Sequence, residues 1–312
     1  MSMWKECEGL QEELVKMRRE LHQIPEFGLD LPETQKYVTD KLDELGIPYK
    51  CSGTDSSIIA EIKGGQPGKT VALRADMDAL KITEANDVDY KSKHEGLMHA
   101  CGHDNHIAML LGAAKVLNAH KAEIKGNVRL LFQTAEELSK GAEIMIKDGA
   151  MDGVDAVFGQ HIGSIINKDI PAGKVIITPG CCMASFDRFV IHVKGTGCHG
   201  STPEKGTYPI TMASHIVINL QEIIAREVSA VKAAVVTIGY FHGGVAYNAI
   251  PSEVEIEGTI RALEEPMRQY LAKRIEEIAK STAATFRGTA EVEMDWGAPP
   301  VINNDEMAAL VT

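Results

Sequence analysis

The alternation of short apolar strands with helical segments is the feature that most constrains the fold of this chain. Four segments have the composition of buried strands bounded by turn residues: 56–62, 70–77, 127–133 and 154–161. Apolar residues at helical spacing predict helices over 107–120 and 141–150 between them, and the stretch 63–69, which is rich in glycine, predicts a turn. This alternation predicts an α/β layer built on a mostly parallel central sheet.

The rhythm changes at about residue 185. From there to residue 296 the pattern predicts strand, helix, strand, strand, helix and strand, which is the order of a ferredoxin-like α+β domain. We therefore predict a first domain over 1–184, an inserted domain over 185–296, and a return to the first domain over 297–312.

Charge and composition exclude several function classes. The net charge of −12 argues against nucleic acid or an anionic membrane as the main partner. The amino-terminal segment has no apolar core of a signal peptide, and no apolar run approaches the roughly 20 residues that span a bilayer. The six cysteines are scattered, which indicates free thiols or metal ligands rather than a disulfide framework, and we expect a cytoplasmic location.

Metal-capable side chains gather where the predicted strands end. In open α/β sheets, ligands bind at the carboxyl ends of the strands. Here those ends and the segment before residue 107 supply Asp76, Asp78, Cys101, His103, Asp104, His106, Glu136, Glu137 and His161. Taken alone, each has an ordinary interpretation: Cys101 as a small buried apolar residue, the two glutamates as a solvated helix start, His161 as a hydrogen-bonded histidine. Their joint placement favours a metal site.

The adjacent glutamates predict a division of labour. Two neighbouring residues do not point the same way into one site, so we assign Glu137 to metal binding and Glu136 to proton transfer. A metal-held hydroxide attacks near neutral pH, and a base must take its proton and pass it to the leaving nitrogen. These parts are the ones that metal-assisted amide hydrolysis needs.

The inserted domain offers fewer signals on its own residues. His199 lies in a glycine-rich loop over 194–206, Asn248 precedes Pro251, and Arg261 is near the end of a predicted strand. From the residues alone, an exposed histidine and a surface ion pair of Arg261 are the favoured interpretations.

Six motifs in order resemble the dinuclear-metal aminoacylase/carboxypeptidase family. They are RADMDAL, MHACGHDNH, FQTAEE, GQH, KGTGCHGSTP and NAIPSEVEIEGTIR. The chain is most similar to the amidohydrolase branch, which includes hippurate hydrolase, N-acetyl-diaminopimelate deacetylase and auxin-conjugate hydrolase. The resemblance implies a metallo-exopeptidase-like catalytic domain with an inserted lid domain that also forms a homodimer. It implies hydrolysis of the amide bond of N-acyl amino acids or related small amides that bear a carboxylate.

The resemblance also implies a role for each matching residue. Metal ligands are implied at Cys101, His103, Glu137 and His161, which would hold two divalent ions such as Mn, Zn, Co or Ni. Catalytic roles are implied for Glu136 as the general base, for Asp78 as the residue that orients the first metal-binding loop, and for His199, which steadies the oxyanion in the partner subunit. Substrate carboxylate binding is implied for Asn248 and Arg261, which reverses the favoured interpretation of Arg261.

The sequence departs from the family pattern at several points. Thr134 stands where the family usually has proline, Glu204 where it has histidine, and Ala249 where it has valine; Asp76 stands where other branches have a ligand histidine. The sequence ends at Thr312, before the glycine-rich segment that carries the last histidine ligand in the family, so we expect a truncated chain. Two alternatives follow: a catalytically impaired fragment, or a non-catalytic protein that binds a metal or a carboxylate.

Overall fold

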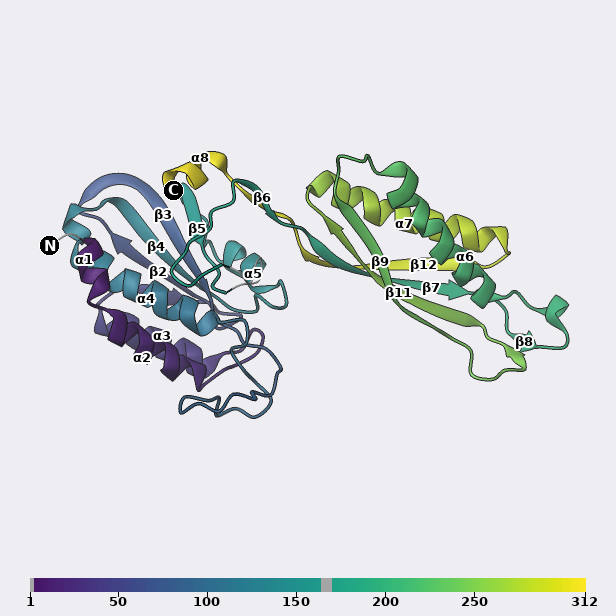
Figure 1. The fold of residues 1–312 in the computed structure, drawn as a ribbon, viewed down its shortest axis with the longest axis horizontal. Helices are drawn as coiled ribbons and strands as arrows, with labels where there is room; N and C mark the ends of the chain where they lie inside the picture. Colours follow the sequence, from purple (N-terminus) through teal and green to yellow (C-terminus); the bar gives the residue numbers. More distant parts are fainter. Residues whose placement is uncertain (1–2, 164–169) are drawn as a thin grey trace. The chain divides into compact units, whose positions relative to one another are not determined.

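The computed structural model describes residues 3–163 and 170–312, with the Trp4 side chain left out. The chain divides into two compact units, Met1–Lys174 and Val175–Thr312 (Figure 1). Each unit has its own apolar core.

The first unit is built on a five-stranded sheet in the order β1-β2-β4-β3-β5. Its strands are β1 (Tyr49–Cys51), β2 (Ile58–Lys63), β3 (Gln66–Asp76), β4 (Lys125–Gln133) and β5 (Ala156–Gly159). Strand β3 pairs in parallel with both β4 and β5, whereas β2 runs antiparallel to β1 and β4. Four of the five strands therefore run in one direction, and the predicted mostly parallel sheet is confirmed.

Helices cover both faces of this sheet. The unit contains α1 (Met3–Glu8), α2 (Gln11–His22), α3 (Pro32–Glu44), α4 (His103–Ala119), a 3-10 turn η1 (Lys121–Glu123) and α5 (Gly141–Lys147). Helices α2, α3 and α4 pack on one face, against strand residues such as Leu130 and Phe132 (Figure 1). Leu131, which points the other way, packs with Met145 of α5. This two-sided burial is why the central strands are apolar at successive positions.

Two boundaries differ from the sequence prediction. Helix α4 begins at His103, four positions before the predicted start, because its first turn carries polar ligand-type side chains that hide the apolar period. Strand β3 begins at Gln66, inside the predicted turn over 63–69. Gln66 pairs with Lys125 and the ladder resumes at Thr70, so an irregular pairing accommodates the Pro-Gly pair between them.

The second unit has the predicted ferredoxin-like order of elements. Its antiparallel sheet runs β12-β7-β11-β9. The elements are β7 (Phe186–Lys194), α6 (Pro209–Glu222), β9 (Ala234–Gly243), β11 (Glu253–Ala262), α7 (Glu265–Thr285) and β12 (Thr289–Ala298). Helices α6 and α7 cover one face, and the buried core lies between them and the sheet (Figure 1).

Shorter elements complete this unit. They are β6 (Gly180–Met183), β8 (Cys198–His199), the 3-10 turn η2 (Pro203–Lys205), the π turn η3 (Ile223–Glu227), β10 (Ala249–Ile250), β13 (Val301–Asn303) and α8 (Asp305–Leu310). Strand β13 pairs with β6, and the Asn303 side chain donates to the Thr178 carbonyl. The return of residues 297–312 to the first domain stays a prediction. Among the described residues, no helix combines the length and apolar composition that a bilayer crossing needs.

Candidate metal centre

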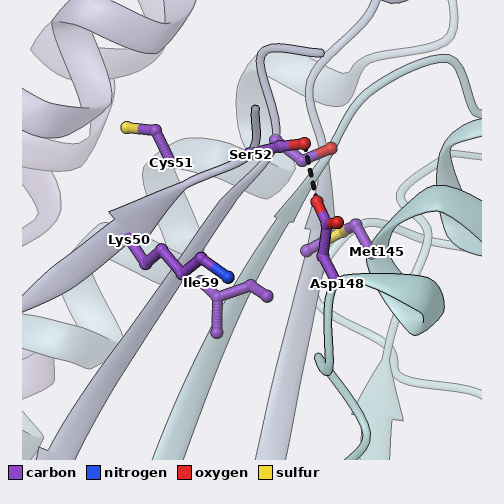
Figure 2. Close-up of a pocket in the computed structure, with 7 residues that line it drawn as sticks. Lys50, Cys51, Ser52, Ile59, Met145 and Asp148 are labelled. Atoms are coloured by element: carbon purple, nitrogen blue, oxygen red, sulfur yellow. Dashed lines mark hydrogen bonds between the residues drawn. The ribbon is translucent and has the colours of Figure 1, made fainter. Parts of the chain in front are cut away.

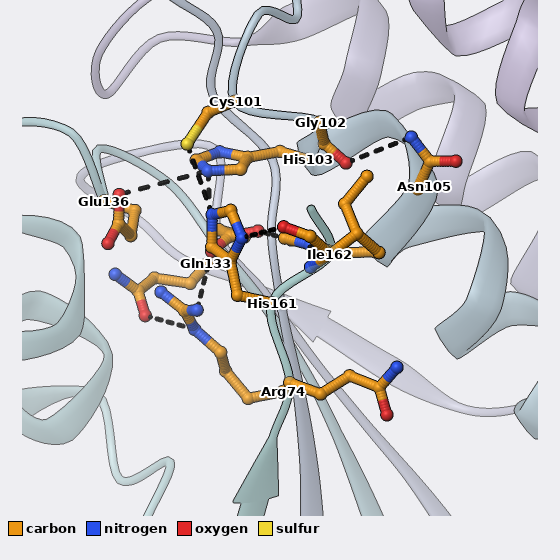
Figure 3. Close-up of polar contacts among 12 residues, drawn as sticks. Arg74, Cys101, Gly102, His103, Asn105, Gln133, Glu136, His161 and Ile162 are labelled. Carbon is orange, nitrogen blue, oxygen red and sulfur yellow. Dashed lines mark hydrogen bonds and ion pairs between the residues drawn. The ribbon is translucent and has the colours of Figure 1, made fainter. Parts of the chain in front are cut away.

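Four segments of the first unit bring ligand-type side chains to one edge of its sheet (Figure 3). They are the end of β3, the loop before α4 with its first turn, the turn after β4 and the segment after β5 that carries His161. Three groups of donors lie within 4.8 Å of one another: Cys101 with His103 and His161, His103 with Glu136 and Glu137, and Asp76 with His103 and His106. The carboxyl ends of β3, β4 and β5 meet at this edge because these strands are parallel.

His103 lies at the centre of the cluster. Its Nε2 is 3.8 Å from Glu137 Oε1 and 4.0 Å from Glu136 Oε2, while Cys101 Sγ is 3.2 Å from His161 Nε2. Both ring nitrogens of His103 and the Glu137 Oε1 atom are buried without a hydrogen-bond partner among the described residues. Unpartnered buried polar atoms are costly, and a cation between them would satisfy them. Thiolate, imidazole and carboxylate donors together suit zinc and neighbouring transition metals, so the residues fit a divalent metal.

The electrostatics of the cluster favour a positive charge at its centre. Burial lowers the pKa of His103, but the nearby Asp78 carboxylate, the Cys101 thiol and the Asp76 carboxylate raise it to about 11. The His103 ring lowers the pKa of the Cys101 thiol, but burial and the Glu137 carboxylate outweigh it, and the net shift is upward. A bound cation would replace the proton of His103 and favour the thiolate of Cys101.

Asp78 fixes the turn that carries the two glutamates. Its Oδ1 accepts the backbone N–H of Glu136 at 2.9 Å, and its Oδ2 accepts that of Glu137 at 3.2 Å. The same carboxylate lies 3.6 Å from His103 Nδ1. Ala135 enters this turn at φ +45°, a left-handed conformation that a non-glycine residue adopts only when its surroundings hold it there. The geometry thus supports the implied role of Asp78 in orienting the segment that carries His103. Through its hydrogen bonds, Asp78 also orients the turn that carries Glu136 and Glu137.

The two glutamates occupy different environments. The Glu136 side chain is 37% exposed and that of Glu137 is 20% exposed. Burial, and next the Asp76 carboxylate, raise the pKa of Glu136. Glu136 is therefore the more solvent-accessible glutamate, with a carboxylate suited to carrying a proton, whereas Glu137 has the buried, unpartnered oxygen.

His161 presents one defined nitrogen to the cluster. Its Nδ1 donates to the Ile162 carbonyl at 2.5 Å, which leaves the Nε2 lone pair facing Cys101. Burial lowers the pKa of His161, so the ring is neutral, as a metal ligand must be.

The first turn of α4 separates its polar residues. Asp104 points away from the cluster: its Oδ2 lies 2.7 Å from His22 Nδ1 and 2.9 Å from Arg18 Nε. It is therefore not placed as a ligand, because successive helical residues point about 100° apart. His106 is hydrogen-bonded to Asp76, and Arg74 pairs with the same aspartate. Nothing in the sequence signals these contacts of His22 and Arg74: His22 lies outside the six motifs, and Arg74 belongs to RADMDAL but is not a ligand-type residue.

Thr134, which stands where the family usually has proline, has a structural role. Its buried hydroxyl donates to Asp55 Oδ2 at 2.6 Å and lies 3.1 Å from the Ser57 hydroxyl. This departure therefore ties the glutamate turn to the loop before β2 and leaves the cluster intact.

Of the three candidate site residues in the second unit, His199 and Asn248 lie side by side. Strand β8 carries His199 and pairs with β10, and the backbone N–H of Gly200 donates to the Asn248 carbonyl at 2.8 Å. Both His199 and Asn248 are exposed. The glycine-rich segment 194–206 is thus paired with the segment that follows Asn248, rather than forming a free loop.

Arg261 lies elsewhere in the second unit. It is at one end of β11, whereas Asn248 precedes β10 at the other end, and the eight steps from Glu253 to Arg261 span roughly 26 Å. The guanidinium lies 5.4 Å from the Phe186 ring and donates to Thr259 Oγ1. In the described part of the chain it forms no ion pair with a carboxylate, so the surface-pair interpretation is not supported.

A hollow elsewhere in the first unit is lined by residues of β1 and α5 and their neighbours (Figure 2). The Ser52 hydroxyl donates to Asp148 across it at 2.6 Å. None of its lining residues belongs to the histidine–carboxylate cluster, so it plays no part in the site.

Proteins that are similar to this chain are named as a deacetylase, an amidohydrolase and a metal-binding peptidase. The chain is 41% identical to the N-acetyl-L-cysteine deacetylase of Bacillus subtilis, over 97% of this chain and 72% of that protein. It is 41% identical to an N-acyl-L-amino acid amidohydrolase of Geobacillus stearothermophilus, over 94% of this chain and 79% of that protein. The crystal structure of the YXEP protein of Bacillus subtilis, described as a dinuclear metal binding peptidase, matches with a TM-score of 0.82 and 35% identity, over 97% of this chain and 81% of that one.

A family profile agrees with these individual matches. It describes peptidase family M20/M25/M40 and matches residues 72–312, which include every ligand-type residue of the cluster and the whole second unit. The chain belongs to peptidase family M20/M25/M40, and it is a hydrolase.

Proposed function

We propose that this protein hydrolyses the amide bond of N-acyl amino acids in a metal-dependent reaction. Family membership and the relatives support metal-dependent amide hydrolysis, and their names supply the substrate class. The observation that carries the proposal is the buried, unpartnered pair of His103 Nε2 and Glu137 Oε1, 3.8 Å apart, beside the more exposed Glu136.

The metal ligands in this proposal are Cys101, His103, Glu137 and His161. Divalent ions held there would supply a Lewis acid and would lower the pKa of a water molecule toward neutrality. The thiolate and imidazole donors favour Zn, Co or Ni over Ca or Mg, and the carboxylate donor also suits Mn.

Glu136 performs the proton transfers in this proposal. Its carboxylate takes a proton from the attacking water as the C–O bond forms. It then gives that proton to the amide nitrogen as the C–N bond breaks, which releases a carboxylic acid and an amine. Asp78 holds the carboxylate in place through the backbone N–H groups of Glu136 and Glu137.

The second unit supplies substrate recognition. His199 stabilises the oxyanion that develops on the carbonyl, and Asn248 and Arg261 bind the substrate carboxylate. The absence of a carboxylate partner for Arg261 among the described residues favours this role, because its remaining donors can take a substrate carboxylate.

The placement of these three residues favours a homodimer. One copy of the second unit presents His199 with Asn248 at one end of its sheet and Arg261 at the other, roughly 26 Å along β11. A small N-acyl amino acid cannot reach both ends at once. We therefore infer that one subunit supplies His199 and Asn248 to a site in which the other subunit supplies Arg261.

Metal binding should release protons at neutral pH. The pKa of His103 is raised to about 11 and that of Cys101 is raised, so both are protonated at pH 7 without metal. Each must lose its proton to bind a cation, so about two protons should leave per loaded chain. Calorimetric zinc titrations in buffers of different ionisation enthalpy measure this number. Cys101→Ser should reduce it by about one, and a titration without proton release would contradict the ligand assignment.

Hydrolysis of a substrate panel tests the function. The zinc- or manganese-loaded protein should hydrolyse N-acetyl-L-cysteine or other N-acyl amino acids, and N-acyl amino acid amides, which lack the carboxylate, should react at least tenfold more slowly. Equal rates for both series would contradict the carboxylate-binding role of Arg261. A loaded protein with no activity on any N-acyl amino acid would contradict the proposal.

Two further assignments stay predictions. The cytoplasm suits a thiolate ligand at Cys101, because a reducing compartment keeps it free. The prediction that the chain is truncated is likewise untested, and the comparisons give no support to the alternative of a catalytically impaired protein.

A further inference from the structure

The cluster contains a buried histidine, His106, that the proposed chemistry does not use. Its donor atoms lie within 4.8 Å of those of Asp76 and His103, so these three residues have the composition of a metal site. Their hydrogen bonds indicate otherwise. His106 Nε2 accepts the backbone N–H of Ile162 at 2.9 Å, and its Nδ1 lies 2.5 Å from Asp76 Oδ1. Because Nε2 accepts a hydrogen bond, the ring is neutral and carries its proton on Nδ1, which donates a hydrogen bond to Asp76, and no lone pair is left for a cation.

Asp76 anchors this histidine to the sheet. Its carboxylate is buried at the end of β3, and its Oδ2 accepts Arg74 Nη1 at 2.6 Å. Arg74 in turn donates from Nε to Oε1 of Gln133 at 2.9 Å (Figure 3). Gln133 is the last residue of β4. The hydrogen bonds therefore run from two paired central strands to His106. Both oxygens of Asp76 therefore accept hydrogen bonds, Oδ1 from His106 and Oδ2 from Arg74, which argues further against a metal at this position.

The far end of this chain of hydrogen bonds is the loop that carries His161. His106 holds the N–H of Ile162, and the carbonyl of Ile162 accepts the His161 Nδ1 proton at 2.5 Å. The His106 and His161 rings also meet edge to face, with centroids 4.7 Å apart. Gly102, at φ +91°, leaves room for the Ile162 side chain, whose Cδ1 would lie 2.6 Å from a Cβ at that position. His161 is itself exposed, so these contacts fix its orientation.

We propose that His106, held by Asp76, is a positioning residue that sets the direction of His161 Nε2 toward Cys101 and that it is not a metal ligand. The inference rests on the proposed metal-binding role of His161. Partners of this kind around a ligand typically change metal affinity by about 10- to 100-fold when they are lost.

Two substitutions at one position separate the two hydrogen bonds of His106. In His106→Asn, the short amide can replace Nδ1 and keep the contact with Asp76, but it leaves the Ile162 N–H unpaired. In His106→Gln, the longer amide can replace Nε2 and keep the contact with Ile162. Both changes replace the imidazole ring with an amide, so they serve as matched controls for each other.

The readout is the binding of Co²⁺, measured by competition with a chelator and by the visible and thiolate-to-cobalt absorption bands. His106→Asn should bind its weaker Co²⁺ ion about 10- to 100-fold less tightly, with altered band intensities, whereas His106→Gln should stay within about threefold of the wild type. Both variants should reach the wild-type number of ions at saturation. Loss of an ion in both variants, or wild-type affinity in His106→Asn, would overturn the inference.

A measurement on the wild type covers the case in which a variant fails to fold. With ¹⁵N-labelled histidine and ¹¹³Cd²⁺, cadmium–nitrogen coupling should appear for His103 and His161 and be absent for His106, whose Nδ1 should carry the proton. Coupling to His106 would overturn the inference. A protein that binds neither Co²⁺ nor Cd²⁺ would instead contradict the proposed function, so the two failures are distinguishable.

Discussion

Glu136→Gln should reduce kcat by about 10²- to 10⁴-fold and leave the metal content unchanged, because it removes a general base and keeps its size. The basis is the contrast between the two adjacent glutamates. Glu136 is the more exposed and its pKa is raised, whereas Glu137 presents a buried, unpartnered oxygen to His103. Steady-state kinetics on an N-acyl amino acid, with elemental analysis of the same sample, measure both quantities.

Glu137→Gln is the matched control for this prediction. It makes the same chemical change one residue later in the same turn, and its backbone N–H is held by the same aspartate. We expect it to lose metal at a free ion concentration that saturates Glu136→Gln. If Glu136→Gln keeps activity within about threefold of the wild type, or if it is the variant that loses metal, the division of roles between these glutamates is wrong.

Mixing two inactive variants should restore activity. His199→Ala and Arg261→Ala should each lose at least 10²-fold in kcat/KM as pure proteins. In a mixed dimer, one site would receive His199 from one chain and Arg261 from the other, and would be complete. Half of the dimers would be mixed and each would have one complete site, so co-refolded chains should show about a quarter of wild-type activity. The reason is that His199 on β8 lies near one end of β11 and Arg261 at the other.

The matched control pairs His199→Ala with Asn248→Ala. These residues lie side by side on β8 and before β10, so they should enter the same site from the same subunit. No mixed dimer would then contain a complete site, and activity should stay at the level of the single variants. Restoration in this control, or its absence in the mixture of His199→Ala with Arg261→Ala, would contradict the shared site.

Much of the fold of the first unit could be predicted from the sequence. Apolar runs such as 127–133 mark strands that are buried on both faces, and parallel strands bring the residues at their ends to one edge. The meeting of Cys101, His103 and the glutamates follows from those two facts. The beginning of α4 could not be placed, because its first turn carries the polar ligand-type residues and lacks the apolar period.

The roles of neighbouring polar residues could not be separated in the same way. Asp104 and His106 belong to the same motif as His103, yet Asp104 contacts His22, which lies 82 positions away, and His106 contacts Asp76. Which side chain faces the cluster depends on the rotation of α4 against α2 and the sheet, and no local pattern specifies that rotation. The distance between Asn248 and Arg261 depends likewise on strand register in the second unit.

The number of metal ions that each chain holds shows whether the site is dinuclear. The 312-residue protein would be purified without chelator, loaded with Zn²⁺ or Mn²⁺, freed of excess ion and analysed by elemental mass spectrometry. We expect two ions per chain in the wild type, and fewer in His103→Ala, which removes the central residue of the cluster. A wild-type protein that retains one ion or none under these conditions would contradict a dinuclear hydrolytic site.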